Sequence, residues 1–258
     1  MNSWRGQLAF GLLCYGVFLV VQLPVWWLFE RLTPWMGPVR VSGPGGTVWS
    51  GSFVNLEWGG IPLGGGQWRL LPERLLQGQM GVAYTLGSSG SGWQVHGQAG
   101  VMTGMRAWVE QAEIVLNVDL WRTRLPWIPP GSRGLVRMQV TEAVVDPEGV
   151  LALRAQGELV QGWIGAPLEV ELGDWRGEAV RDEGRGLLVR LEDRAGPWQG
   201  RLTVGIKPDG RYRVRGRLSV RQLSDERHKN LLRVMGAVDA QGGVLVDESG
   251  TLQKGLKP

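Results

Sequence analysis

Two hydrophobic patterns divide the chain. The first is an apolar run over residues 6–29, GQLAFGLLCYGVFLVVQLPVWWLF, in which no residue is charged. The second is a period-two alternation of apolar and polar residues, repeated in short segments from about residue 39 to residue 246. A continuous apolar run of this length is typical of a membrane-spanning helix, whereas alternation is typical of half-buried β-strands. The pattern therefore predicts a transmembrane helix followed by a β domain.

The fate of the apolar run decides where the rest of the chain lies. As one helix, residues 6–29 would extend ~36 Å, enough to cross a hydrocarbon core of ~30 Å. A cleaved signal peptide is the main alternative, but the residues after the run offer no small-x-small cleavage site. A buried core helix is a second alternative. We predict an uncleaved signal anchor that leaves residues 1–5 in the cytoplasm, because Arg5 and the terminal amine precede the run.

The alternating segments predict a mainly β fold. They span residues 39–42, 54–58, 67–70, 79–86, 93–99, 112–120, 136–140, 151–159, 168–172, 187–191, 202–206, 212–220 and 244–246. The Pro-Asp-Gly turn at 208–210 lies between two alternating runs and predicts a hairpin, because proline fixes φ and glycine accepts a positive φ. We expect successive hairpins that build one or two twisted antiparallel sheets.

Two short helices and one boundary complete the predicted organisation. A single helical turn is expected at 72–76, and a longer helix at 225–235, for which Ser224 is available as N-cap and Gly236 can end the helix. The proline-rich segment 126–131 interrupts regular structure, because proline lacks a backbone donor. We therefore divide the exported part into β halves at residues 35–125 and 131–258.

The composition and the absence of known motifs argue against most enzymatic and metal-binding functions. The single cysteine, Cys14, lies in the apolar run, so no intramolecular disulfide can form. The two histidines, His96 and His228, are too far apart to give a recognisable zinc spacing. No phosphate-binding glycine loop, nucleophile elbow or Cys-x-x-Cys motif is present. We predict no enzymatic activity, no catalytic residue, no metal and no cofactor; with dispersed basic residues, we also expect no nucleic acid partner.

Two groups of side chains are candidates for an interaction patch. The first group contains tryptophans in the early strands, and the second contains arginines on one side of a single late strand. They are Trp49, Trp58 and Trp68, and Arg211, Arg213, Arg215 and Arg217. The tryptophans could line a groove or docking surface, or form β core. The arginines could bind anionic lipid headgroups or an acidic partner, or pair with acids on a neighbouring strand, such as Glu192 or Asp193.

Three local motifs add a family resemblance. They are GTVWSG at residues 46–51, GQWRLLP at 66–72 and LLQG at 75–78. With the N-terminal apolar run, the proline-rich break and the hairpin at 208–210, they resemble the type II (general) secretion system protein N family of Gram-negative bacteria over essentially the whole chain. The resemblance implies a single-pass inner-membrane protein with its bulk in the periplasm, which supports export of folded proteins across the outer membrane. Its implied partners are other components of that system, in the inner-membrane platform or the outer-membrane secretin assembly.

The resemblance leaves a second hypothesis open. The family is also similar to AsmA-like proteins, whose periplasmic β structures include lipid-handling grooves. In that case the sheet is curved, one of its faces is an apolar groove, and the protein binds or bridges lipids. An open apolar channel would favour this hypothesis, and inward side chains packed without a channel would exclude it.

Overall fold

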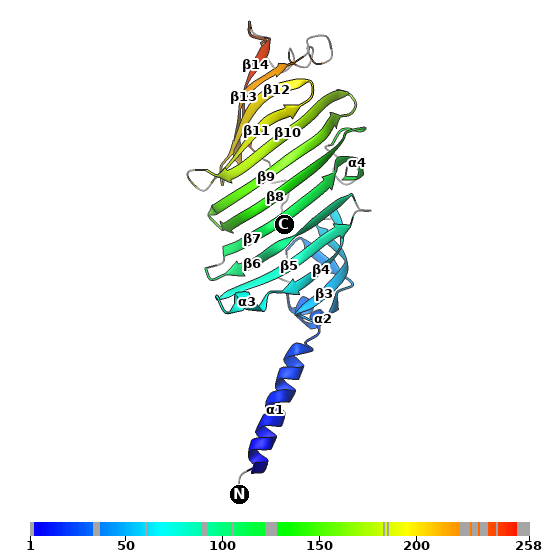
Figure 1. Ribbon diagram of the computed structural model, residues 1–258, viewed down its shortest axis with the longest axis vertical. Coiled ribbons are helices and arrows are strands. Elements are labelled where there is room, and N and C mark those ends of the chain that lie inside the picture. Colours follow the sequence, from blue (N-terminus) through cyan, green and yellow to red (C-terminus); the bar gives the residue numbers. More distant parts are fainter. Residues whose placement is uncertain are drawn as a thin grey trace.

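A single antiparallel sheet forms the body of the protein. The computed structural model describes residues 3–32, 37–59, 61–88, 92–104, 106–121, 128–182, 184, 186–221, 228, 232, 237–240 and 242–251. Within these residues the sheet has fourteen strands in the order β1-β3-β4-β5-β6-β7-β8-β9-β10-β11-β12-β13-β14, with β2 paired to β3 outside this path. From β2 onward, strands that are consecutive along the chain are therefore neighbours, and the strands are stacked along the long axis of the molecule (Figure 1).

The elements have the following bounds. The helices are α1 (Ser3–Val21), α2 (Val25–Leu32), α3 (Pro72–Leu75) and α4 (Val118–Trp121). The strands are β1 (Val39–Ser42), β2 (Gly45–Gly46), β3 (Ser50–Trp58), β4 (Ile61–Leu70), β5 (Gln79–Ser88), β6 (Trp93–Met102), β7 (Arg106–Asn117), β8 (Arg133–Asp146), β9 (Gly149–Ile164), β10 (Val170–Arg181), β11 (Leu187–Ala195), β12 (Trp198–Ile206), β13 (Arg211–Val220) and β14 (Gly243–Thr251).

The predicted β fold is confirmed, as one sheet rather than two. The hairpin around residues 208–210 joins β12 to β13, and the helical turn predicted at 72–76 is α3. The strand predicted at 112–120 is wrong at its end, because β7 stops at Asn117 and α4 follows. The Asn117 side chain accepts a hydrogen bond from the backbone N–H of Asp119 at 3.0 Å, which favours a turn over a continued strand. The helix predicted at 225–235 lies almost entirely outside the described residues.

The N-terminal helix differs from its prediction. The expected continuous helix over 6–29 is wrong, because α1 ends at Val21 and α2 begins at Val25. Pro24 explains the break, since proline has no N–H and disfavours helical geometry at the residue before it. Pro24 instead forms an isolated β-bridge with Thr47. In the part of the chain that the structure describes, no helix combines the length and apolarity needed to cross a membrane.

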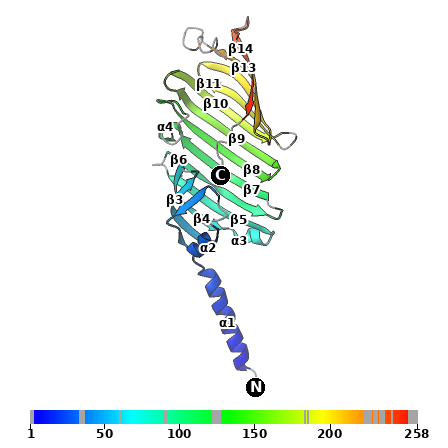
Figure 2. The ribbon, with the colours of Figure 1, turned by 180° about the vertical axis from the view of Figure 1, so that it is seen from behind.

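The sheet is a single twisted layer for most of its length. Figures 1 and 2 show α1 projecting from the β3–β4 end, while β13 and β14 turn away from the plane of the central strands at the other end. The main buried cluster lies at this second end and contains Val170, Trp198, Leu218, Val220, Leu232 and Val244. Strands β7 and β8, which flank the proline-rich segment, are paired from Ala107–Val145 to Asn117–Leu135. Hydrogen bonding therefore continues across the predicted boundary, and the division into two halves stays a prediction.

Candidate functional site

On one face of the sheet, apolar residues and glycines form a continuous row that crosses the strands. Each member is the direct cross-strand partner of the next, over the twelve strands from β3 to β14. We call this row the apolar lane; its members are Phe53, Gly66, Leu86, Val95, Ile114, Met138, Gly157, Gly177, Leu191, Leu202, Gly216 and Val246. Directly opposed residues point to the same face of a sheet. The lane therefore extends along the long axis of the protein, across the strands.

Two glycines near the middle of the lane leave a hollow. At Gly66, a Cβ atom would approach Phe53 and Leu86 within 2.6 and 2.8 Å, so neighbouring side chains already cover that position. At Gly157 the nearest atom to such a Cβ would be the backbone oxygen of Arg137, 3.2 Å away, and at Gly177 it would be one methyl carbon of Leu191, 3.0 Å away. Both glycines line the groove that lies above them. These two glycines are directly paired. Because neither has a side chain, the floor of the sheet is low where β9 and β10 meet.

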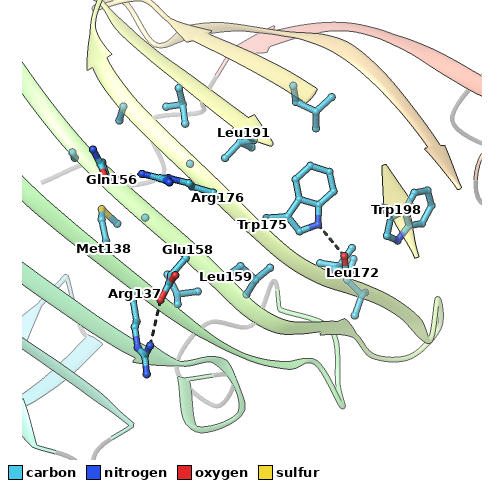
Figure 3. A pocket seen from close by; sticks show the side chains of 18 of the residues that line it. Arg137, Met138, Gln156, Glu158, Leu159, Leu172, Trp175, Arg176, Leu191 and Trp198 are labelled. Carbon is cyan, nitrogen blue, oxygen red and sulfur yellow. Dashed lines mark hydrogen bonds and ion pairs between the residues drawn. The ribbon is translucent and has the colours of Figure 1, made fainter. Parts of the chain in front are cut away.

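An apolar groove of about 620 Å³ lies over this hollow. Side chains from β8 to β13 form its floor, and residues at and between the ends of β9 and β10 contribute to its lining (Figure 3). The apolar residues that line it are Val136, Met138, Ala155, Leu159, Ile164, Leu168, Leu172, Trp175, Ala179, Val189, Leu191, Trp198, Leu202 and Leu218. The volume is in the range of pockets that hold small molecules in proteins, about 300–1,000 Å³.

The two tryptophans at the groove have their polar atoms bonded to the protein backbone. The indole N–H of Trp175 donates to the carbonyl of Leu172 at 2.9 Å, and that of Trp198 donates to the carbonyl of Glu171 at 2.7 Å. Trp198 is 3% exposed, and the ring of His228 lies edge-on to it, with centroids 5.3 Å apart. Both indoles are therefore fixed in position and have no N–H left for a ligand in the groove.

The opposite face of the same strands is charged. Arg137 on β8 and Glu158 on β9 are cross-strand partners, joined by an ion pair of 3.3 Å. Arg176 on β10 donates to the side chain of Gln156 at 3.1 Å. Alternation of side chains along each strand separates these polar groups from the apolar face. The sheet is thus amphipathic, with an apolar face and a charged face.

Each member of the predicted arginine group on β13 lies in an ion pair; Arg211, Arg213 and Arg215 are exposed, and Arg217 is half-buried. Arg211 pairs with Asp209 at 2.6 Å, and Arg217 pairs with Asp239 at 2.8 Å. Arg213 and Arg215 both approach Asp247, at 2.7 and 3.7 Å. The hydrogen bond from Arg213 is the main cause that lowers the pKa of Asp247.

The acidic partners of β13 are not those expected from the sequence. Glu192 and Asp193 lie on β11, which is separated from β13 by β12. Glu192 pairs with Arg201 at 2.5 Å, and the hydrogen bond from Arg201 is the main cause that lowers the pKa of Glu192. Asp193 pairs with Arg221. The arginines therefore pair with acids other than the two named from the sequence, and only Asp247 among these lies on a neighbouring strand. Binding of a partner by this strand stays a prediction.

The predicted tryptophan group lies at the other end of the sheet. Trp68 on β4 stacks on Phe53, with ring centroids 6.1 Å apart, and meets Phe29 of α2 edge-on at 6.0 Å. The indole N–H of Trp49 donates to the carbonyl of Val20 at 2.8 Å, which connects the end of α1 to the sheet. Trp58 ends β3, and its side chain lies outside the described residues. The structure therefore does not bring the tryptophan and arginine groups together, and their role as an interaction patch stays a prediction.

The groove residues were missed because they look like ordinary β core in the sequence. Most of their strands were predicted, but the strand predicted at 168–172 stops short of Gly177, since β10 runs from Val170 to Arg181. Glycine is frequent throughout the chain, so Gly157 and Gly177 do not stand out in the sequence. The feature that marks the groove is a pair of glycines that face each other on neighbouring strands within the apolar lane. This pairing can be recognised only when the register of the strands is known. Among the described residues, no group of three metal-ligating side chains gathers.

Comparison with known proteins identifies the family. A model described as type II secretion system (T2SS), protein N, matches residues 37–246. This range starts just before β1 and ends within β14, so it covers nearly the whole sheet. The chain belongs to the type II secretion system protein N family.

Two curated members of the family are similar over nearly their full length. The chain is 24% identical to the type II secretion system protein N of Pectobacterium carotovorum subsp. carotovorum, over 93% of this chain and 94% of the relative. It is 25% identical to the protein of the same name from Vibrio cholerae serotype O1, over 96% of this chain and 100% of the relative. No solved structure matches the chain. The family resemblance expected from the three sequence motifs is therefore confirmed.

Proposed function

We propose that this protein is a non-enzymatic component of the type II secretion system, with its β-sheet in the periplasm and its N-terminal segment at the inner membrane. The observation that carries the proposal is the family match over residues 37–246, together with two full-length relatives named type II secretion system protein N. Its action would be recognition of other components of the system, so that folded proteins are exported across the outer membrane.

The apolar surface of α1 supports a place at the membrane. Phe10, Leu12 and Leu13 are 69%, 63% and 64% exposed, and further apolar side chains are exposed along the rest of the helix. Exposed apolar surface of this extent is typical of a site that contacts a membrane or another protein. Trp49 is hydrogen-bonded to α1, and Trp68 contacts α2. If α1 lies at the membrane, the adjoining end of the sheet therefore lies near the membrane as well.

A secretion assay tests the main proposal. We expect a strain without this gene to retain folded type II substrates in the periplasm, and expression of the full chain to restore their release into the medium. A strain without a core component of the system is the positive control. Normal secretion in the deletion strain would contradict the proposed function.

Reporter fusions test the location separately. Alkaline phosphatase joined after residue 60 is active only outside the cytoplasm, so we expect an active fusion. β-Galactosidase joined at the same residue is the matched control and is expected to be inactive. Inactive phosphatase with active galactosidase would contradict a periplasmic location, whatever the outcome of the secretion assay.

Crosslinking in cells tests the partners. Photo-crosslinking residues at Trp68 and at Arg213 sample the two ends of the sheet, and mass spectrometry identifies what they capture. We expect components of the secretion system at one end or both. Capture of no such component from either position would count against the proposed interactions.

A further inference from the structure

We propose that the groove over Gly157 and Gly177 binds an acyl chain of a membrane phospholipid. This goes beyond a role in secretion, because it assigns the apolar face of the sheet a ligand of its own. The shape, the chemistry of the lining and the path that leads to the groove each support the same occupant.

The surface of the groove consists of apolar carbon atoms and has almost no hydrogen-bonding group. Four polar residues belong to the same strands, but their charged or amide ends are on the charged face, where Arg137 pairs with Glu158 and Arg176 donates to Gln156. The indole N–H groups of Trp175 and Trp198 are already bonded to backbone carbonyls. A ligand in the groove can therefore be held only by apolar contact.

The lack of hydrogen-bonding groups in the groove makes a peptide a poor occupant. A peptide strand carries an N–H and a C=O at almost every residue, and burying them without partners is unfavourable. A hydrocarbon chain has no such groups and gains from every methylene removed from water. The lining therefore fits an acyl chain better than a polypeptide.

The walls of the groove argue against a second copy of the sheet. Leu168 lies between β9 and β10, and Ile164 and Leu172 lie at the adjoining ends of these strands; all three line the groove together with its floor. A flat sheet packs about 10 Å from its partner over a broad face. A groove with a floor lowered at two glycines and with apolar side walls is narrow, which suits a single flexible chain better than a flat sheet.

The apolar lane points to membrane lipid as the source of that chain. The lane begins with Phe53, which stacks on Trp68, and Trp68 in turn contacts Phe29 of α2. From there the lane continues through paired residues to Gly157 and Gly177 without a charged member. An apolar surface thus connects the helical segment to the groove. This step rests on the proposed position of that segment at the inner membrane.

Site-specific photo-crosslinking in cells tests the proposal on the full chain. Cells are grown with radioactive phosphate, and benzoylphenylalanine replaces Leu191 in the groove or Leu168 at its rim. The matched control has benzoylphenylalanine in place of Arg190, which neighbours Leu191 on β11 and points to the opposite face. After irradiation and denaturing electrophoresis, we expect at least fivefold more phosphate label on the protein from either groove position than from Arg190. Equal labelling from both faces, no label from either groove position, or an adduct there to a protein would overturn the proposal.

Filling the groove provides an independent test. Gly177→Met places a side chain over the floor, with only the flexible end of Leu191 close to its Cβ, and we expect it to lower the label captured at Leu168 about fivefold. Glu178→Met adds the same side chain to the opposite face and is expected to leave the label unchanged. Ala179→Asp, which puts a carboxylate in the groove, replaces Gly177→Met if that variant is degraded in cells. Equal loss in the groove and control variants, or no loss in a stable groove variant, would overturn the proposal.

The outcomes separate this inference from the proposed function. Secretion is not measured in the crosslinking experiment, so absence of lipid with normal complementation rejects only the groove. An inactive phosphatase fusion rejects the location, whatever the crosslinks show.

Discussion

Removal of the Trp198 ring should loosen one end of the sheet and leave the other end intact. Trp198 is 3% exposed, packs in the cluster with Leu218 and Val244, and donates its indole N–H to the carbonyl of Glu171. Replacement of a buried aromatic residue by alanine typically costs about 3–5 kcal/mol. The substitution Trp198→Ala also leaves the Glu171 carbonyl without that donor.

The architecture predicts that this cost stays local. The strong contacts between described elements join strands that are neighbours in the sheet, as in repeat proteins whose stability is a sum of nearest-neighbour terms. The strands β12–β14 should therefore open more often, while β5–β7 should keep their protection. Since about 1.4 kcal/mol corresponds to a factor of ten, amide exchange in β12–β14 should accelerate roughly a hundredfold to a few thousandfold.

Hydrogen–deuterium exchange of the purified full chain, followed by mass spectrometry, measures this effect strand by strand. Trp108→Ala is the reciprocal control, because Trp108 is 2% exposed and lies on β7, in the middle of the sheet and separated from β12 by four strands. It should accelerate exchange in β5–β8 and spare β12–β14. Acceleration of the whole sheet by either substitution would refute the reasoning, because it would show that the sheet unfolds as one cooperative unit.

Three further substitutions test individual contacts. Arg74→Ala removes a guanidinium that lies 4.7 Å from the ring centre of Trp108 and pairs with Glu110 at 2.6 Å, and it should lower the free energy of unfolding by about 1–2 kcal/mol in urea titration. Trp49→Phe removes the hydrogen bond to the last turn of α1, so proteolysis between α1 and α2 should be about two- to tenfold faster. Arg213 keeps the pKa of Asp247 below its ordinary value of 3.8, so the stability that this carboxylate contributes is present above pH 3.8 and is lost as the pH falls through its folded-state pKa. Asp247→Asn should accordingly lower the melting temperature slightly at pH 7, and this difference should shrink as the pH falls below 3.8; an equal effect at every pH would contradict the ion pair.

The sequence alone determined most of the strands of the sheet and their amphipathic character. Side chains alternate between faces with a period of exactly two, so a half-buried strand shows itself within a few residues, as at 79–86 and 202–206. Turn chemistry is equally local, which is why the hairpin at 208–210 was correctly predicted. The family was also accessible, because its motifs are short and contiguous.

Only the tertiary structure decided which residues share a face and where the groove lies. A bulge at Gln111, which has a φ of 50°, shifts the register of β7. Simple alternation would place Trp108 and Ile114 on one face, but Trp108 packs under Arg74 on the charged face, while Ile114 belongs to the apolar lane. Bulges and register depend on hydrogen bonds between strands, which a local pattern does not encode. The break in the apolar run at Pro24 is likewise stabilised from outside, through the β-bridge to Thr47 and the hydrogen bond from Trp49.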